Sequence, residues 1–181
     1  NDASAPTIAS TSINTANTEL TVTFSESVYD TTGGTGDLEV ADFALSITGG
    51  TATLGSAIPT SITKTSQTVW VLGFSTSGTA NGSETITVAP ASSTSIYDAA
   101  ANAAATSQSN NTASFNDASA PTIASTSINT ANTELTVTFS ESVYDTTGGT
   151  GDLEVADFAL SIAGGTATLG SATPTSITKT S

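Results

Sequence analysis

Acidic side chains are the residue type in this sequence whose number and grouping could support chemistry. The 181 residues include 16 Asp and Glu and two Lys but no Arg, His, Cys or Met, so the net charge is −14. Without His or Cys, the chain lacks imidazole bases, thiolate nucleophiles and the usual ligands of zinc, haem and iron–sulfur clusters. So acidic a chain also disfavours nucleic-acid binding, which begins with clustered cationic side chains, and it favours cations as partners.

The acids are concentrated where the predicted topology brings distant segments together. Five of the nine acids in residues 1–115 lie between Glu26 and Asp42. In an antiparallel sandwich the first strand leads away from the N-terminus and the second returns, so residues following the second strand lie beside the start of the domain. The loop at 98–102 should reach the same end. We therefore expect five residues to converge at one end of the domain, namely Asp2, Glu26, Asp30, Asp98 and Asn102.

Hard oxygen ligands without cationic neighbours are suited to calcium, which takes six to eight oxygens at about 2.3–2.6 Å. Strand alternation turns Glu26 towards the core side, where an unpaired carboxylate is costly. The sequence therefore predicts bound calcium at this end of the domain. The alternative is a solvated acidic loop that serves only solubility, and the EF-hand pattern is absent.

Catalysis is not expected from the remaining short motifs. Ser61 and Lys64 have the Ser-x-x-Lys spacing of penicillin-binding enzymes, but the Ser-Asp-Asn and Lys-Thr-Gly elements that this chemistry needs do not occur. The sequence predicts a protein that is not an enzyme.

An internal duplication sets the domain organisation. Residues 1–66 recur as 116–181, a shift of 115 positions, with differences only at Thr48 against Ala163 and Ile58 against Thr173. Such a period is that of a complete small domain and exceeds that of solenoid repeats. We therefore predict a complete repeat at 1–115 and the truncated first part of a second at 116–181. Since half a domain cannot bury its own core, we expect the chain to be an internal piece of a longer protein, or to be completed by another molecule.

Within one repeat, apolar residues alternate with Ser and Thr at the period of two that is typical of strands. Turns are predicted at Gly49-Gly50 and Ala89-Pro90, among other sites, and no helix is expected. Trp70 is expected in the core. About seven short strands in 115 residues is the pattern of an immunoglobulin-like β-sandwich, so the predicted fold class is all-β. The predicted strands cover residues 7–13, 20–25, 42–48, 51–54, 69–74, 83–88 and 112–115.

Three motifs carry a resemblance to a known family: Ala5-Pro6-Thr7, Phe24-Ser25-Glu26-Ser27-Val28 and Tyr97-Asp98-Ala99-Ala100-Ala101-Asn102. In this order they resemble the bacterial immunoglobulin-like tandem repeats of large cell-surface proteins and adhesins, over the whole repeat. The resemblance implies extracellular stalk modules with calcium at the domain junctions. It also implies Asp117 and Glu141 as junction ligands from the second copy, and we add Asp145, the counterpart of Asp30. One departure is Ala101, where the family usually has Gly and where a positive φ would be strained.

The sequence thus predicts a non-enzymatic, extracellular bacterial stalk of tandem repeats, rigidified by calcium at acidic junctions. Its expected partners are adjacent repeats of the same chain, without nucleic acid and without membrane insertion by this segment, which has no apolar run near 20 residues. The alternative is a subunit of an extracellular filament or sheath, in which neighbouring chains complete the half-repeat at 116–181 by strand complementation. A glycan-binding module is disfavoured, because Trp70 and most other aromatic residues have core parity.

Overall fold

The computed structural model describes residues 2–180 and divides into two compact units, Asn1–Ser119 and Ala120–Ser181. In the first unit, strands dominate, with one short 3-10 turn, η1, at Val40–Asp42. Its strands are β1 (Ile8–Ile13), β2 (Glu19–Phe24), β3 (Phe43–Thr48), β4 (Thr53–Leu54), β5 (Ser61–Lys64), β6 (Val69–Gly73), β7 (Thr76–Ser77), β8 (Thr85–Pro90) and β9 (Thr112–Ser114).

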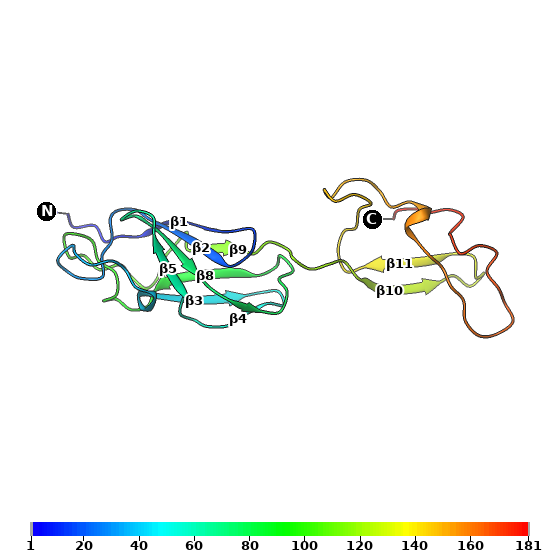
Figure 1. The fold of residues 1–181 in the computed structure, drawn as a ribbon, viewed down its shortest axis with the longest axis horizontal. Helices are drawn as coiled ribbons and strands as arrows, with labels where there is room; N and C mark the ends of the chain where they lie inside the picture. The colour runs from blue at the N-terminus through cyan, green and yellow to red at the C-terminus, as the bar shows by residue number, and fades with distance from the viewer. Residues whose placement is uncertain (1, 181) are drawn as a thin grey trace. The chain divides into compact units, whose positions relative to one another are not determined.

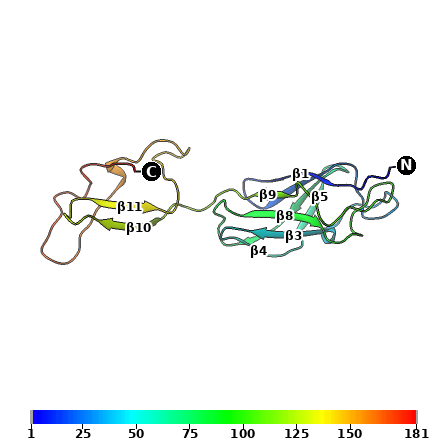
Figure 2. The ribbon, with the colours of Figure 1, turned by 180° about the vertical axis from the view of Figure 1, so that it is seen from behind.

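The first unit is a β-sandwich, which confirms the predicted all-β class (Figure 1). One sheet has the strand order β1-β2-β6-β5, the other has β3-β8-β9, and a short pair joins β4 to β7. All these pairs are antiparallel, and the view from behind shows β3, β8 and β9 side by side (Figure 2). Apolar residues of both sheets form one core, in which Trp70 is 1% exposed, as expected.

All seven strands predicted for the first repeat are present, within two residues of their predicted ends. The structure differs from the prediction in two further strands and one turn. The strands β5 and β7 were not predicted, since β7 has two residues and β5 has a single apolar residue, Ile62. The turn predicted at Ala89-Pro90 was wrong, because both residues belong to β8. Proline fits there because it ends the strand, where losing a backbone donor costs little.

The β1–β2 hairpin defines two ends of the first unit. Ile8 pairs with Phe24, so the chain entering β1 lies beside the chain leaving β2. The hairpin turn lies about 20 Å away at the other end, given about 3.3 Å per residue along a six-residue strand. We call these the entry end and the turn end.

The second unit contains the same hairpin, formed by β10 (Ile123–Ile128) and β11 (Leu135–Phe139), and the same 3-10 turn, η2 (Val155–Asp157). Residues 158–163, 168–169 and 176–179 correspond to β3, β4 and β5 but are not in strands. In the first unit those strands pair with β8, β7 and β6, which all come from residues 67–115. Within residues 2–180, no helix is long and apolar enough to cross a membrane.

Candidate metal centre

Three carboxylates from distant parts of the sequence meet at the entry end of the first unit. Asp2, Glu26 and Asp98 each place an oxygen within 4.8 Å of the others. Asp2 precedes β1 and Glu26 follows β2, so the hairpin brings these two together. The third reaches them because Tyr29 and Tyr97 exchange backbone hydrogen bonds of 2.8 Å. We call these three residues the acidic cluster.

Asp98 organises the loop that carries it. It is 1% exposed, and its Oδ1 accepts hydrogen bonds from the backbone N–H groups of Ala100 (2.9 Å) and Asn102 (2.7 Å). Asn102 Nδ2 donates to Asp98 Oδ2 (2.6 Å) and to the backbone oxygen of Asp2 (3.3 Å). Burial raises the pKa of Asp98, but these hydrogen bonds more than offset it, so the pKa lies below its ordinary value. Asp98 is therefore ionised at neutral pH.

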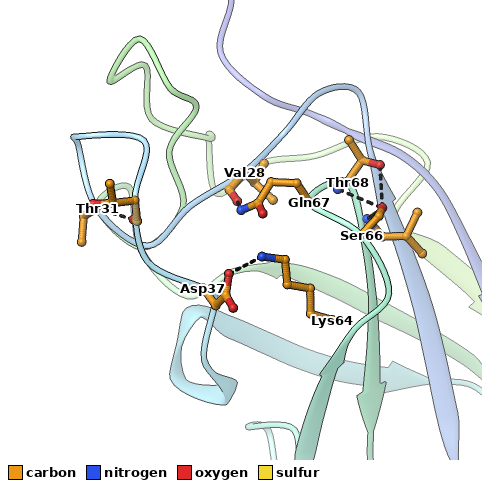
Figure 3. A network of polar contacts seen from close by, with 9 residues as sticks. Val28, Thr31, Asp37, Lys64, Ser66, Gln67 and Thr68 are labelled. Atoms are coloured by element: carbon orange, nitrogen blue, oxygen red, sulfur yellow. Dashed lines mark hydrogen bonds and ion pairs between the residues drawn. The ribbon is translucent and has the colours of Figure 1, made fainter.

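Glu26 feels the opposite balance. Burial raises the pKa of Glu26, and the negative charges of Asp2 and Asp98 raise it further. Both lysines of the chain are engaged elsewhere: Lys64 contacts Asp37 (Figure 3), and Lys179 contacts Asp152 at 2.6 Å. The acidic cluster therefore carries a repulsion that a bound cation would relieve.

The donor chemistry of the acidic cluster fits calcium. All three side chains offer carboxylate oxygens, which hard cations prefer, and no sulfur or imidazole is present. Asn102 uses its amide nitrogen for Asp98 and Asp2, so its Oδ1 is the atom that could bind a cation. The predicted convergence of these four residues is confirmed, and their role as ligands stays a prediction.

Asp30 lies outside the acidic cluster, which corrects the expectation that it would join these residues. The loop that follows folds around its carboxylate, such that a Cβ added at Gly36 would lie 1.8 Å from Asp30 Oδ1. Asp30 instead influences Asp42, whose pKa is raised by burial and by the charges of Asp30 and Glu39, against one hydrogen bond that lowers it.

The ligands expected from the second copy are divided between the two units. Asp117 belongs to the first unit, where its Oδ1 accepts a hydrogen bond from the backbone of Ser119 (2.8 Å) and its backbone bridges to Asn81. Glu141 and Asp145 belong to the second unit, where Asp145 lies against Gly151 as Asp30 lies against Gly36. The repeated residues 116–181 correspond to residues 1–66 and so do not include a counterpart of Asp98. Within residues 2–180, a group of three carboxylates close enough to hold a metal ion occurs once, in the first unit.

A buried carboxylate that the sequence analysis did not single out is Glu84, which is 0% exposed. It accepts backbone hydrogen bonds from Thr51 (2.7 Å), Ala52 (2.9 Å) and Asn81 (3.0 Å). Burial raises the pKa of Glu84, and the hydrogen bonds from these residues and from its own N–H lower it below the ordinary value. Glu84 lies two residues before Ile86 and four before Val88, so strand alternation places it on the same buried face. This alternation was the signal that could have revealed a buried carboxylate. Its role is to hold two turns at the turn end.

The strain expected at Ala101 is present, with φ at +71°. Replacing Ala101 by glycine should raise the free energy of unfolding of the first unit by about 0.5–1 kcal/mol, because glycine adopts positive φ without a clash of its Cβ. Urea denaturation followed by Trp70 fluorescence measures this. Ala100→Gly is the control, since Ala100 lacks a positive φ and should gain nothing. An equal gain from both variants would contradict the assignment of strain to Ala101.

The fold and the acidic cluster together define a β-sandwich protein with an oxygen-rich candidate cation site. No family model matches the chain, and no curated protein matches it. Among solved structures, the chain is similar to domains 1–6 of the surface layer protein SbsC, with 23% sequence identity and a TM-score of 0.45. The match covers 75% of this chain, which spans 18% of that chain.

Proposed function

We propose that this protein is a non-enzymatic, extracellular stalk of bacterial origin, built from tandem immunoglobulin-like repeats and stiffened by calcium. The observation that carries the proposal is the acidic cluster within a duplicated sandwich sequence. Asp2 lies in the segment that leads into the repeat, whereas Glu26 and Asp98 belong to its body. A cation held by all three would therefore tie the incoming segment to the domain.

Strand order supports the immunoglobulin-like part of the proposal. Constant-type immunoglobulin domains pair strands A-B-E-D in one sheet and C-F-G in the other. The first unit has β1-β2-β6-β5 and β3-β8-β9, which is the same order when the short β4 and β7 are set aside.

The connection between the repeats also favours a stalk, because little of it is free to rotate. At the turn end of the first unit, Asn116 bonds with Asn17 through its backbone N–H (2.9 Å), and Ser119 Oγ donates to the Ala80 carbonyl (3.0 Å). In the second unit, Thr122 N–H already donates to Ser140 Oγ (2.9 Å). Only Ala120 and Pro121 lie between these anchored residues, and the proline ring fixes one backbone angle.

Calcium would act on this arrangement by cross-linking and by charge neutralisation. It would join the segment before β1 to the end of β2 and to the 98–102 loop, and would remove the repulsion felt by Glu26. In the second copy, Asp117 and Glu141 would supply the equivalent ligands. Asp30 and Asp145 are not part of the proposed set, since each lies within its own loop.

Calcium addition tests the proposal. We expect free calcium at about 100 times the dissociation constant to stabilise the first unit by about 2.7 kcal/mol, measured as a rise in the Trp70 melting temperature relative to chelator. Glu26→Ala should weaken calcium binding by about tenfold or more, because it removes a ligand and a charge. Glu19→Ala is the matched control, since Glu19 is an exposed glutamate on β2. Equal losses from the two variants, or no calcium-dependent shift, would overturn the calcium proposal.

A second candidate function is a filament or sheath subunit completed by strands of neighbouring chains. One observation favours it: the second unit exposes large apolar side chains, namely Ile123, Ile128, Leu135, Tyr144, Ile162, Leu169 and Ile177. Concentration-dependent fibres in electron micrographs would favour this candidate. A monomeric mass in solution across the same concentrations would favour the stalk.

A further inference from the structure

The first and last strands of the first unit are held together by side chains. The strands β1 and β9 lie against each other but belong to different sheets, so within residues 2–180 no ladder of backbone hydrogen bonds joins them. Instead, Thr11 Oγ1 donates to the carbonyl of Thr112 (2.7 Å). The N–H of Ile8 donates to Gln108 Oε1 (2.8 Å). Each of these hydrogen bonds therefore depends on the identity of one side chain.

Similar contacts continue to both ends of the unit. At the turn end, Asn17 Nδ2 donates to the Asn116 carbonyl (2.8 Å), and Asn17 Oδ1 accepts from the Asn116 N–H (2.9 Å). Asn17 is 8% exposed, so water competes little for these bonds. At the entry end, Asn102 Nδ2 donates to the backbone oxygen of Asp2, as described above. We call the contacts between residues 2–17 and residues 102–116 the terminal seam.

The order of the contacts gives the direction of the two segments. Residues 8, 11 and 17 meet, in this order, residues 108, 112 and 116. The residue numbers rise together on both sides, whereas in the antiparallel β1–β2 pair one rises as the other falls. The terminal seam therefore joins two segments that run in the same direction, from the entry end to the turn end.

This parallel arrangement determines how the unit resists tension between its two ends. The chain enters at the entry end and leaves at the turn end, where residues 116–119 are bound. Tension therefore pulls β1 back towards the entry end and β9 forward towards the turn end. The two segments would have to slide along each other, so all the contacts between them are strained at once. If the segments were unzipped instead, the contacts would break one after another, each at a lower force.

We propose that the terminal seam is the force-bearing element of the first unit, and that Thr11, Gln108 and Asn17 set its resistance to tension. This role rests on the proposed stalk function, since a stalk transmits force along its chain from repeat to repeat. The rate of unfolding under force follows the barrier to unfolding and not the equilibrium stability. We therefore expect an unfolding rate that depends on the direction in which the unit is pulled.

The test pulls single molecules of the full chain in chelator. The sequence has no cysteine, so pairs of introduced cysteines define the attachment points. The pair Ser4→Cys and Ala120→Cys, at exposed positions, loads β1 against β9 in shear. The pair Ser4→Cys and Ser107→Cys unzips the seam from the entry end, because Ser107 is exposed and directly precedes Gln108. We expect a higher unfolding force in shear, and equal forces in the two directions would overturn the proposal.

Matched variants test the individual contacts. Thr11→Val should speed unfolding at constant force in shear by about fivefold, equivalent to about 1 kcal/mol for one hydrogen bond. Thr21→Val is the control, because Thr21 is also half-buried but its hydroxyl makes no hydrogen bond among the described residues. Gln108→Leu removes the acceptor of the Ile8 N–H and should repeat the effect of Thr11→Val. Equal rates for Thr11→Val and Thr21→Val, or the same acceleration in both pulling directions, would refute the assigned role.

The measurement separates this inference from the calcium proposal, because the chelator excludes calcium. A calcium-dependent rise in melting temperature without a directional difference in force would refute the terminal seam and leave the calcium-stiffened stalk standing. A directional difference without any effect of calcium on melting would support the terminal seam and overturn the calcium proposal.

Discussion

Replacing Glu84 by alanine is expected to lower the free energy of unfolding of the first unit by about 2–4 kcal/mol, because buried backbone donors would lose their acceptor. The Glu84 carboxylate accepts hydrogen bonds from Thr51, Ala52 and Asn81, and the Ala52 N–H is buried with it. Thermal unfolding followed by Trp70 fluorescence checks the prediction, since the single tryptophan lies in this unit. Glu19→Ala, an exposed change of the same type, should have little effect.

Acid should reduce the difference between the wild type and Glu84→Ala. The folded-state pKa of Glu84 lies below its ordinary value, so its carboxylate stabilises the fold at pH values above about 4.3, the pKa of an unperturbed glutamate. That contribution is lost as the pH falls through the folded-state pKa. A difference in stability that stays constant down to the pH of acid unfolding would contradict the assigned role. The free energy of unfolding of Glu84→Gln should lie between those of the wild type and Glu84→Ala, because the glutamine amide keeps one acceptor oxygen.

Replacing Gly49 by alanine is expected to destabilise the first unit by about 2–4 kcal/mol, through both backbone strain and a steric clash. Gly49 has φ of +77°, and a Cβ there would lie 2.4 Å from the backbone oxygen of Ser83. That oxygen belongs to the turn that Glu84 holds, so it cannot move without disturbing buried hydrogen bonds. The Trp70 unfolding transition measures the loss.

The duplication provides a matched control for Gly49. Gly164 has nearly the same neighbours in sequence and φ of +75°, but no atom lies within 4 Å of its Cβ position. Gly164→Ala should therefore cost about 1 kcal/mol locally, from the backbone alone, and leave the Trp70 transition in place. Similar shifts of that transition by both changes would show that the clash with Ser83 does not matter.

The acidic cluster was predictable in part because antiparallel strands return the chain to its starting point. That rule placed Asp2 beside Glu26, and the loop before the last strand brought Asp98 and Asn102 to them. Asp30 was misplaced because its loop folds back on Gly36, a close contact that no residue pattern announced. Glu84 was not singled out, although it alternates with the buried residues Ile86 and Val88 along the chain.

The sequence by itself determined the charge, the repeat and the alternation that defines most strands and places Trp70 in the core. Alternation follows from the two-residue period of a strand, so it is visible without any partner. Alternation alone does not decide whether a given copy forms its strands. Residues 43–47 and 158–162 are identical, yet only the first set forms a strand.

The tertiary structure decided this difference, because a strand exists only when another strand accepts and donates its backbone hydrogen bonds. In the first unit, residues 67–115 supply the pairing strands and cover Ile8 and Leu20. In the second unit, the hairpin β10–β11 persists because both of its strands lie within the repeated sequence. The same residues are therefore core in one copy and surface in the other, since burial depends on contacts with residues distant in sequence.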